Sequence, residues 1–464
     1  MSSTFFGFTI GMRALSVNQQ ALEITSHNIA NINTPGFSKQ EAVIKSSSPQ
    51  SMASLTRSIN SGQIGTGVEI EQIRRLRDEY AERQLRSEMQ NLGKWECSVD
   101  ILSQTGIVFS EPGENGLSSV LDAYWNAWKE LEANPEDMAK RKILVDKSKM
   151  LTNFFQSIDS RLTQLQSGIN TEIKNKILEI NNYASQISEL NKSIKDALTV
   201  GDVSNDLLDR RDSLIDKLSK MINVTAKESD FGQIDIYIGS KTLVRGDQVT
   251  LINAELDAAQ KFYNINWNDD GTEVSLQNGE LYALKNFRDN YIPGIIDKMD
   301  DFVSTLITET NLVHNSGFGL DGISTGNDFF TGTGIKDIGI NPDIEDNLSL
   351  IAAASFLGQQ GDNSNISKIV GLRDALLLNG GTINFDNYYN SLIIQMGIDG
   401  QQSSRELENT ELIIDKINAR QDSISGVSLD EELVNLVKFQ HAYNAAAKII
   451  TTMDELMDTI INKM

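Results

Sequence analysis

Apolar residues at the two ends of the chain recur with heptad spacing. Near the start, four positions are seven residues apart, namely Phe8, Leu15, Leu22 and Ile29. Near the end, positions step by alternating fours and threes and include Leu429, Leu433, Leu436, Tyr443, Ala447, Ile450 and Met457. Such spacing predicts one narrow apolar seam on each of two helices, as in coiled coils. We therefore expect the two ends to pair and other subunits to bury what the pair leaves exposed.

Most of the remaining chain also has helical periodicity. We expect helices at about 2–34, 78–105, 117–132, 135–198, 205–222, 287–313, 347–358, 367–378 and 387–423, and a terminal helix from 428. The helix expected at 387–423 should be interrupted near 397–400, where two glycines occur. At 1.5 Å per residue, the longest helix would be a rod of about 90 Å. A rod of that length is typical of a spacer or bundle spine.

One internal segment changes from helical to strand periodicity. Residues 233–238 alternate between apolar and polar side chains, and Asn268-Asp269-Asp270-Gly271 is a strong turn signal. We place a small β-rich insertion at about 225–285. The expected fold is therefore mainly α with an inserted β-rich domain.

The length of 464 residues is too great for one ordinary core. We expect three domains: a terminal coiled-coil assembly domain (1–36 plus 428–464), a helical rod domain (37–224 plus 286–427) and an outer β-rich domain (225–285). The rod domain would contain the long helix, and the insertion would project from it.

Charge and composition narrow the function classes. The formal net charge of −23 disfavours a nucleic-acid partner. Cys97 is the only cysteine, so neither an intramolecular disulfide nor a cysteine metal site is expected. The first residues lack the pattern of a secretory signal peptide, and no apolar run is long enough for membrane insertion. A specialised export route that reads an uncleaved N-terminus remains compatible with this pattern.

Motifs that would indicate catalysis are incomplete. The three histidines form no H-E-x-x-H pattern. Gly322–Gly326 matches G-x-S-x-G but lies in a glycine-rich loop without a strand before it. A calcium-like loop at 266–271 has Gln277 where a bidentate carboxylate is required. We therefore expect no enzyme activity, and no catalytic, cofactor-binding or metal-binding residues.

Two terminal motifs resemble the bacterial flagellar rod and hook family. The first is Asn28-Ile29-Ala30-Asn31-Ile32-Asn33-Thr34-Pro35-Gly36-Phe37-Ser38, and the second covers 427–433 and 440–450. Central segments, including Trp125-Asn126-Ala127-Trp128 and Asn205–Asp212, are similar to the hook-associated members of that family. The chain departs from the family pattern at Phe37, where tyrosine is usual, and in its short insertion.

The resemblance implies a structural subunit of the hook–filament junction. Its implied partners are the hook protein, a second hook–filament junction protein, copies of itself in a ring, and a dedicated export chaperone at the C-terminal region. It also implies secretion through the flagellar export apparatus. The expected assembly interface consists of the terminal seam residues together with Asn28, Asn31, Pro35 and Gly36. Alternatives are a hook or distal-rod paralogue, or a secreted coiled-coil adhesin.

Overall fold

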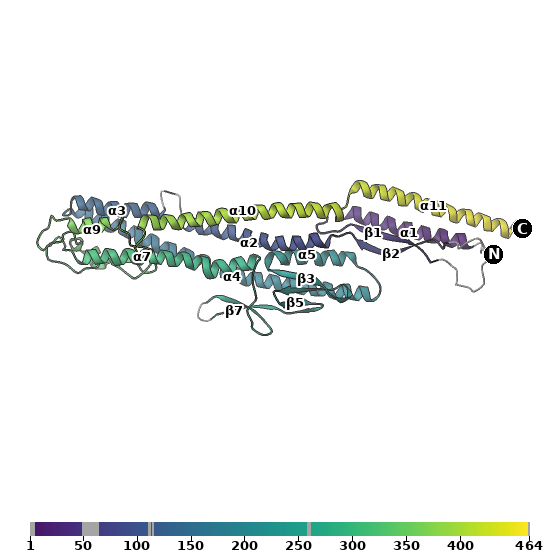
Figure 1. Ribbon diagram of the computed structural model, residues 1–464, viewed down its shortest axis with the longest axis horizontal. Coiled ribbons are helices and arrows are strands. Elements are labelled where there is room, and N and C mark those ends of the chain that lie inside the picture. The colour runs from purple at the N-terminus through teal and green to yellow at the C-terminus, as the bar shows by residue number, and fades with distance from the viewer. Residues whose placement is uncertain (1–4, 49–64, 110–112, 114–115, 258–260, 463–464) are drawn as a thin grey trace. The chain divides into compact units, whose positions relative to one another are not determined.

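The computed structural model describes residues 5–48, 65–109, 113, 116–257 and 261–462 (Figure 1). The chain forms two compact units. Unit 1 contains residues 1–89, 180–251 and 410–464, and unit 2 contains residues 90–179 and 252–409. Within the described residues, long helices dominate and the sheets are small, which confirms the expected fold class. The three-domain division expected from the sequence stays a prediction.

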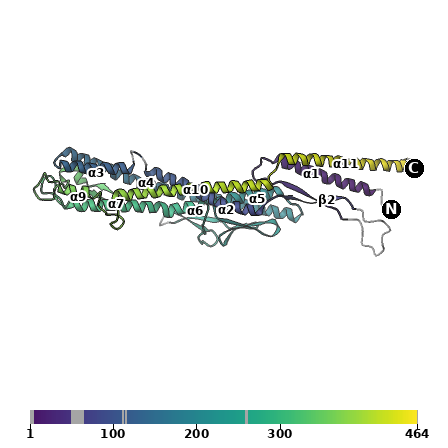
Figure 2. The ribbon, with the colours of Figure 1, turned by 45° about the horizontal axis from the view of Figure 1, so that its top comes forward.

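The terminal helices of unit 1, α1 (Phe5–Ala30) and α11 (Leu429–Asn462), pack along each other. Figures 1 and 2 show them side by side. Small residues permit this approach, because a Cβ added at Gly7 would lie 2.7 Å from Met453 Cε and one at Gly11 would lie 3.0 Å from Ile450 Cγ1. The terminal pairing expected from the sequence is confirmed. Residues 2–4 of the expected first helix lie outside the described residues.

Among its described residues, unit 1 also contains α5 (Asn205–Met221) and two antiparallel sheets. Strands β1 (Gln40–Ser46) and β2 (Val68–Arg75) form a ribbon that contacts α1. The second sheet has the order β3-β4-β5-β6; its strands are Val224–Glu228, Ile234–Ile238, Lys241–Arg245 and Gln248–Val249. The 3-10 turn η1 (Asp230–Gly232) joins β3 to β4. Asn191 fixes this sheet, because its Nδ2 donates to the carbonyls of Ile234 and Gly246, both at 2.8 Å.

Three helices contribute residues to both units: α2 (Glu79–Phe109), α4 (Met138–Thr199) and α10 (Phe385–Ser425). Unit 2 adds α3 (Leu117–Ala133), α6 (Glu280–Asn286), a π-helical turn η2 (Phe287–Tyr291), α7 (Ile292–Asn315), α8 (Pro342–Asp346), the 3-10 turn η3 (Leu348–Leu350) and α9 (Ser364–Gly371). Its short strands are β7 (Ile252–Leu256), β8 (Tyr263–Trp267), β9 (Phe330–Thr331) and β10 (Gly339–Ile340).

The core of unit 2 is built from large aromatic side chains. Trp128 and Phe329 are completely buried, with ring centroids 5.0 Å apart. Tyr124 lies against Trp125 with a centroid distance of 4.8 Å. Such rings combine a large buried area with favourable tilted packing. His314 of α7 also packs against Phe329, with ring centroids 5.4 Å apart, so this core holds α3, α7 and the loop before β9 together.

The segment expected to be β-rich ends earlier than predicted. The named strands end at Trp267, and α6 begins at Glu280, inside the expected range of 225–285. Leu281 and Leu284 of α6 are completely buried. Because these two leucines are three residues apart, they lie on the same face of a helix, and burial of that face favours helix in this segment. The strands also form separate sheets, β3–β6 in unit 1 and β7–β8 in unit 2.

Three helix predictions in unit 2 were wrong in detail. Residues 347–358 contain only the turn η3, because tertiary bonds occupy the backbone: Ala352 N donates to His314 Nε2 at 3.0 Å, and Ala352 O accepts from Asn365 Nδ2 at 3.0 Å. The helix expected at 367–378 is α9, which ends at Gly371. Helix α10 continues through 397–400, since isolated glycines cost a helix only about 1 kcal/mol each.

Candidate assembly interface

The covered face of the terminal pair lies next to the predicted seam. On α1 the fully buried residues are Gly11, Val17, Ala21, Thr25 and Asn28. On α11 they are Glu432 and Ala446. Most of the fully buried positions are therefore small or polar, and Met453 and Ile450 of α11 pack against Gly7 and Gly11. Of the predicted seam residues, Ile450 lies in this contact against Gly11, whereas Phe8, Leu429 and Leu433 are exposed.

The predicted seam residues are exposed or half-buried in the single chain. Phe8, Leu429 and Leu433 are exposed, at 38%, 46% and 46%. The half-buried members are Leu15, Leu22, Ile29, Leu436, Tyr443, Ala447, Ile450 and Met457. Other apolar side chains of α11, such as Val434 at 68%, are also exposed. The terminal pair therefore presents an apolar surface that this chain alone does not cover.

Asn28 joins α1 to both β1 and α11. Its Nδ2 donates to the carbonyl of Gln40 at 2.9 Å and to Glu432 Oε2 at 3.0 Å. Its Oδ1 accepts from Gln40 N at 3.0 Å. Asn28 is 1% exposed, so removing its amide would take this partner from the backbone of Gln40 and from Glu432 Oε2, although Glu432 Oε1 would stay paired with Lys39. This predicted residue is a central link of the terminal pair.

Lys39 is a link that the sequence analysis missed. Its Nζ lies 3.0 Å from Glu431 Oε2 and 3.1 Å from Glu432 Oε1. Burial opposes the charge, but the hydrogen bonds to both glutamates raise the pKa of Lys39 above its ordinary value. Its backbone N also donates to the carbonyl of Ser425, just before α11. Sequence offered no signal for this contact, since the partners are about 390 positions apart.

The turn after α1 is fixed by its own polar residues. Asn31 Nδ2 donates to His27 O at 3.1 Å, and Asn31 Oδ1 accepts from Thr34 Oγ1 at 3.1 Å. Gly36 has a φ of +81°, which favours glycine, and both Pro35 and Gly36 are exposed. The turn lines a cavity of about 520 Å³ together with residues of α4 and α5.

The turn is tied to α5 through Asp209. This carboxylate accepts from Ser38 N at 3.0 Å and from Ser38 Oγ at 2.8 Å. Gln40 Nε2 donates to Asp206 Oδ1 at 2.9 Å. The terminal motif therefore meets the central 205–212 motif, which the family resemblance had identified separately.

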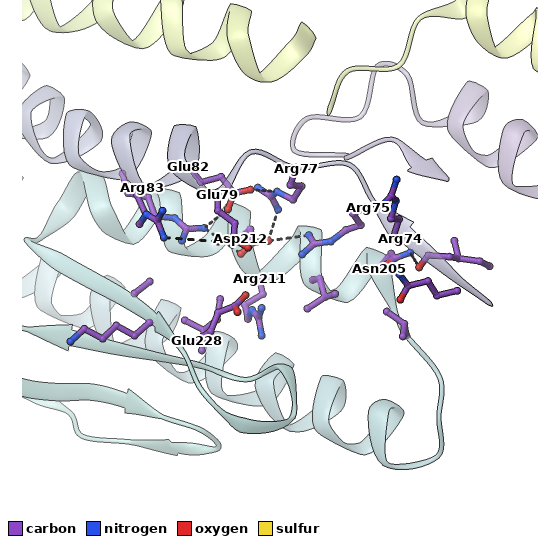
Figure 3. A pocket seen from close by; sticks show the side chains of 18 of the residues that line it. Arg74, Arg75, Arg77, Glu79, Glu82, Arg83, Asn205, Arg211, Asp212 and Glu228 are labelled. Atoms are coloured by element: carbon purple, nitrogen blue, oxygen red, sulfur yellow. Dashed lines mark hydrogen bonds and ion pairs between the residues drawn. The ribbon is translucent and has the colours of Figure 1, made fainter. Parts of the chain in front are cut away.

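A buried ion-pair network continues from α5 to the start of α2 (Figure 3). Arg75 Nη1 lies 2.6 Å from Asp209 Oδ1 and 3.0 Å from Asp212 Oδ2. Arg77 also pairs with Asp212, and Arg86 Nη2 lies 3.3 Å from Asp212 Oδ1. The network lines a cavity of about 700 Å³. Removing one partner of such a buried pair would leave an uncompensated charge.

The environment decides the charge state of the network. Burial opposes ionisation of Asp212, but Arg77, Arg75 and Arg86 outweigh it and hold the pKa of the carboxyl below its ordinary value. Burial lowers the pKa of Arg211 to about 10. Arg211 Nη1 donates to Asn191 Oδ1 at 3.1 Å and to the carbonyl of Gly232 at 2.6 Å, which holds the turn before β4. These residues serve structure.

In the part of the chain that the structure describes, no group of three His, Cys, Asp or Glu side chains is placed to hold a metal ion. Among the described helices, none combines the length and apolar character required to cross a membrane.

Comparisons with known proteins match both the ends and the middle of the chain. The family model described as flagellar hook-associated protein FlgK helical domain matches residues 102–330. The model described as flagella basal body rod protein matches 8–37, and the model described as flagellar basal body rod FlgEFG protein C-terminal matches 422–463. The two terminal matches cover most of α1 and all of α11.

Full-length relatives are also similar. The flagellar hook-associated protein 1 of Bacillus subtilis is 31% identical over 506 residues, which cover 100% of this chain and 99% of the relative. That of Escherichia coli is 24% identical, with 97% of this chain and 98% of the relative covered. The solved structure of the flagellar hook junction protein FlgK from Burkholderia pseudomallei is similar in fold, with a TM-score of 0.63, 13% identity, and coverage of 74% of this chain and 100% of that chain.

Proposed function

This chain belongs to the flagellar hook-associated protein 1 family, and on that premise we propose that it is a subunit of the hook–filament junction that assembles through its terminal helices. Members of the family are structural proteins of the flagellum, so the subunit is non-enzymatic. The observation that carries the proposal is the uncovered apolar surface of the α1–α11 pair.

That surface supports assembly because large apolar side chains are exposed along it. Leu433, Val437 and Ile449 are 46–49% exposed on α11. Contiguous exposed apolar surface marks interaction sites on soluble proteins. A shallow hollow lined by Ala445, Lys448, Ile449, Thr452 and Met453 lies on the same helix. Helices of neighbouring subunits would cover this surface in an assembled ring.

The proposed partners follow from the place of such a ring. They are the hook protein on one side, a second hook–filament junction protein on the other, and copies of this chain within the ring. A dedicated chaperone would cover the C-terminal region before export. Export through the flagellar apparatus is supported by the composition, since a chain with the single cysteine Cys97 carries no internal cross-link.

Complementation of a strain that lacks the gene tests the proposal. Without the protein, hooks should form but filaments should not be retained. Leu433→Asp should be exported but should fail to restore filaments, because a carboxylate in a dried interface has no partner. Lys438→Asp, an exposed position of the same helix, is the matched control.

The same assay separates the alternatives. Loss of a hook or distal-rod paralogue would remove the hook itself. Loss of an adhesin would leave motility unchanged. Normal filaments with Leu433→Asp would contradict assembly through the terminal helices.

A further inference from the structure

Two loops of unit 2 expose three large apolar side chains together. Ile323 is 75% exposed, Phe356 63% and Leu357 68%. The loops are joined by a hydrogen bond from Gly358 N to the carbonyl of Gly322 at 3.0 Å, so the three residues are neighbours on the surface. We call them the apolar knob. Ordinary surfaces expose single apolar residues, whereas such groups mark interaction sites.

The same unit carries an unfilled apolar groove, lined by residues of α2 and α4. Its volume is about 540 Å³, and Ile101, Ile107, Val108, Leu165 and Ile169 supply its apolar lining. Gly168 also lines the groove, and a Cβ added there would have no atom within 4 Å. A groove of this size accepts several apolar side chains.

Charges at the knob and at the groove are complementary. Arg161 and Glu172 line the groove on α4 and lie eleven residues, or about 16 Å, apart along the helix. Arg161 has no carboxylate within 4 Å among the described residues. Beside the knob, Asp321 accepts from Ile323 N at 3.0 Å, and Asp362 accepts from Ser355 N at 2.8 Å. Lys368, whose Nζ donates to Ser355 Oγ at 3.1 Å, is the cation on that side.

We propose that the apolar knob of one copy docks into the α2–α4 groove of a second copy, with Asp321 facing Arg161 and Lys368 facing Glu172. This inference rests on the proposed function and adds the contact that would hold neighbouring subunits in the ring. Knob and groove are different surfaces of one chain, so the contact is head-to-tail. Head-to-tail contacts of identical subunits close into rings when the rotation permits.

Cysteine cross-linking tests the contact in the full-length protein. In a Cys97→Ser background, Leu357→Cys is combined with Gln164→Cys, an exposed residue that lines the groove. Oxidation should produce a ladder of dimers, trimers and larger species, both in concentrated protein and in isolated hook–filament junctions. The matched control combines Leu357→Cys with Leu178→Cys, which is 59% exposed on the same helix outside the groove lining.

Adding Phe356→Ser should reduce the ladder several-fold without changing the melting temperature, because that side chain is exposed in the free chain. A ladder no stronger than that of the control pair would overturn the proposal. So would a ladder that Phe356→Ser leaves unchanged. If filaments remain attached while the cross-link is absent, the docking is wrong and the junction role stands. The opposite outcome is also possible: the cross-linked ladder is strong, but cells without the protein keep their filaments. That outcome would contradict the junction role and leave the docking in place.

Discussion

The α1–α11 pair and the core of unit 2 achieve burial in opposite ways. Between the terminal helices the fully buried residues are mostly small or polar, such as Ala21, Asn28 and Glu432, and the large apolar side chains of the seam are half-buried or exposed. In unit 2 the large aromatic side chains of the core are inside, with Trp128 and Phe329 completely buried. Unit 2 therefore carries its own core, whereas the terminal pair holds a defined geometry and leaves its apolar surface for other subunits.

The strongest test of this contrast is to remove an aromatic residue from the core of unit 2. Trp128→Ala should lower the free energy of unfolding by about 3–5 kcal/mol, because it deletes a buried ring and leaves a cavity. Urea denaturation followed by circular dichroism measures this. Ile394→Ala, at a position 61% exposed, should change it far less. If both substitutions lowered the free energy of unfolding equally, the aromatic core would not be what stabilises unit 2.

A second test uses pH. His314 Nε2 accepts from Ala352 N, and Nδ1 lies 2.6 Å from the carbonyl of Asn327, so the buried ring is held neutral. Burial lowers its pKa to about 4. An unfolded histidine titrates near 6.5, so the unfolded chain gains the proton first as the pH falls. The stabilisation is complete above about pH 6.5 and is lost as the pH falls towards 4, on the order of 3 kcal/mol in all.

Denaturation of the wild type and of His314→Gln at several pH values checks this expectation. The variant should be less stable at neutral pH and should lose less stability between about pH 6.5 and 4. A wild-type curve parallel to that of the variant would contradict the neutral, buried histidine.

A smaller effect is expected at the polar link of the terminal pair. Asn28→Ala should lower stability by about 1–3 kcal/mol, because it leaves Glu432 and the backbone of Gln40 with unsatisfied groups. The change should appear as faster hydrogen exchange in α1 and the first turns of α11. Asn33→Ala, at an exposed position of the adjacent turn, serves as the control. Unchanged exchange in α1 would show that Asn28 does not hold the pair together.

A charge introduced on the exposed face of α11 should have the smallest effect on stability but a large effect on assembly. Val434→Asp, at a position 68% exposed, should change the free energy of unfolding by no more than about 0.5 kcal/mol. In a complementation assay it should nevertheless leave filaments unattached, because the introduced charge would be buried between subunits. If the variant assembles normally, this part of α11 faces solvent in the ring.

The positions of most helices followed from the sequence, because their apolar periodicity is long and regular. The three alanines at 352–354 are an instructive failure, since they favour helix locally. In the folded protein, His314 and Asn365 bind the backbone of Ala352, and an isolated alanine run cannot outweigh such buried bonds. Likewise, nothing in the sequence around Arg75, Arg77 and Arg86 indicated that their carboxylate partners lie on α5.

By itself, the sequence determined that this is a mainly helical chain of the flagellar hook-associated family, with paired terminal helices and no catalytic motif. Only the tertiary structure decided which side of each terminal helix is covered. Neighbouring positions on a helix differ by about 100° in direction. Glu432 is therefore buried while Leu433 is exposed, and which of the two faces α1 depends on how α11 is rotated and how closely its backbone approaches that of α1. The heptad spacing predicts that each terminal helix has an apolar stripe. The face along which the two helices meet is instead set by the small residues Gly7 and Gly11 and by the contacts of Asn28 and Lys39.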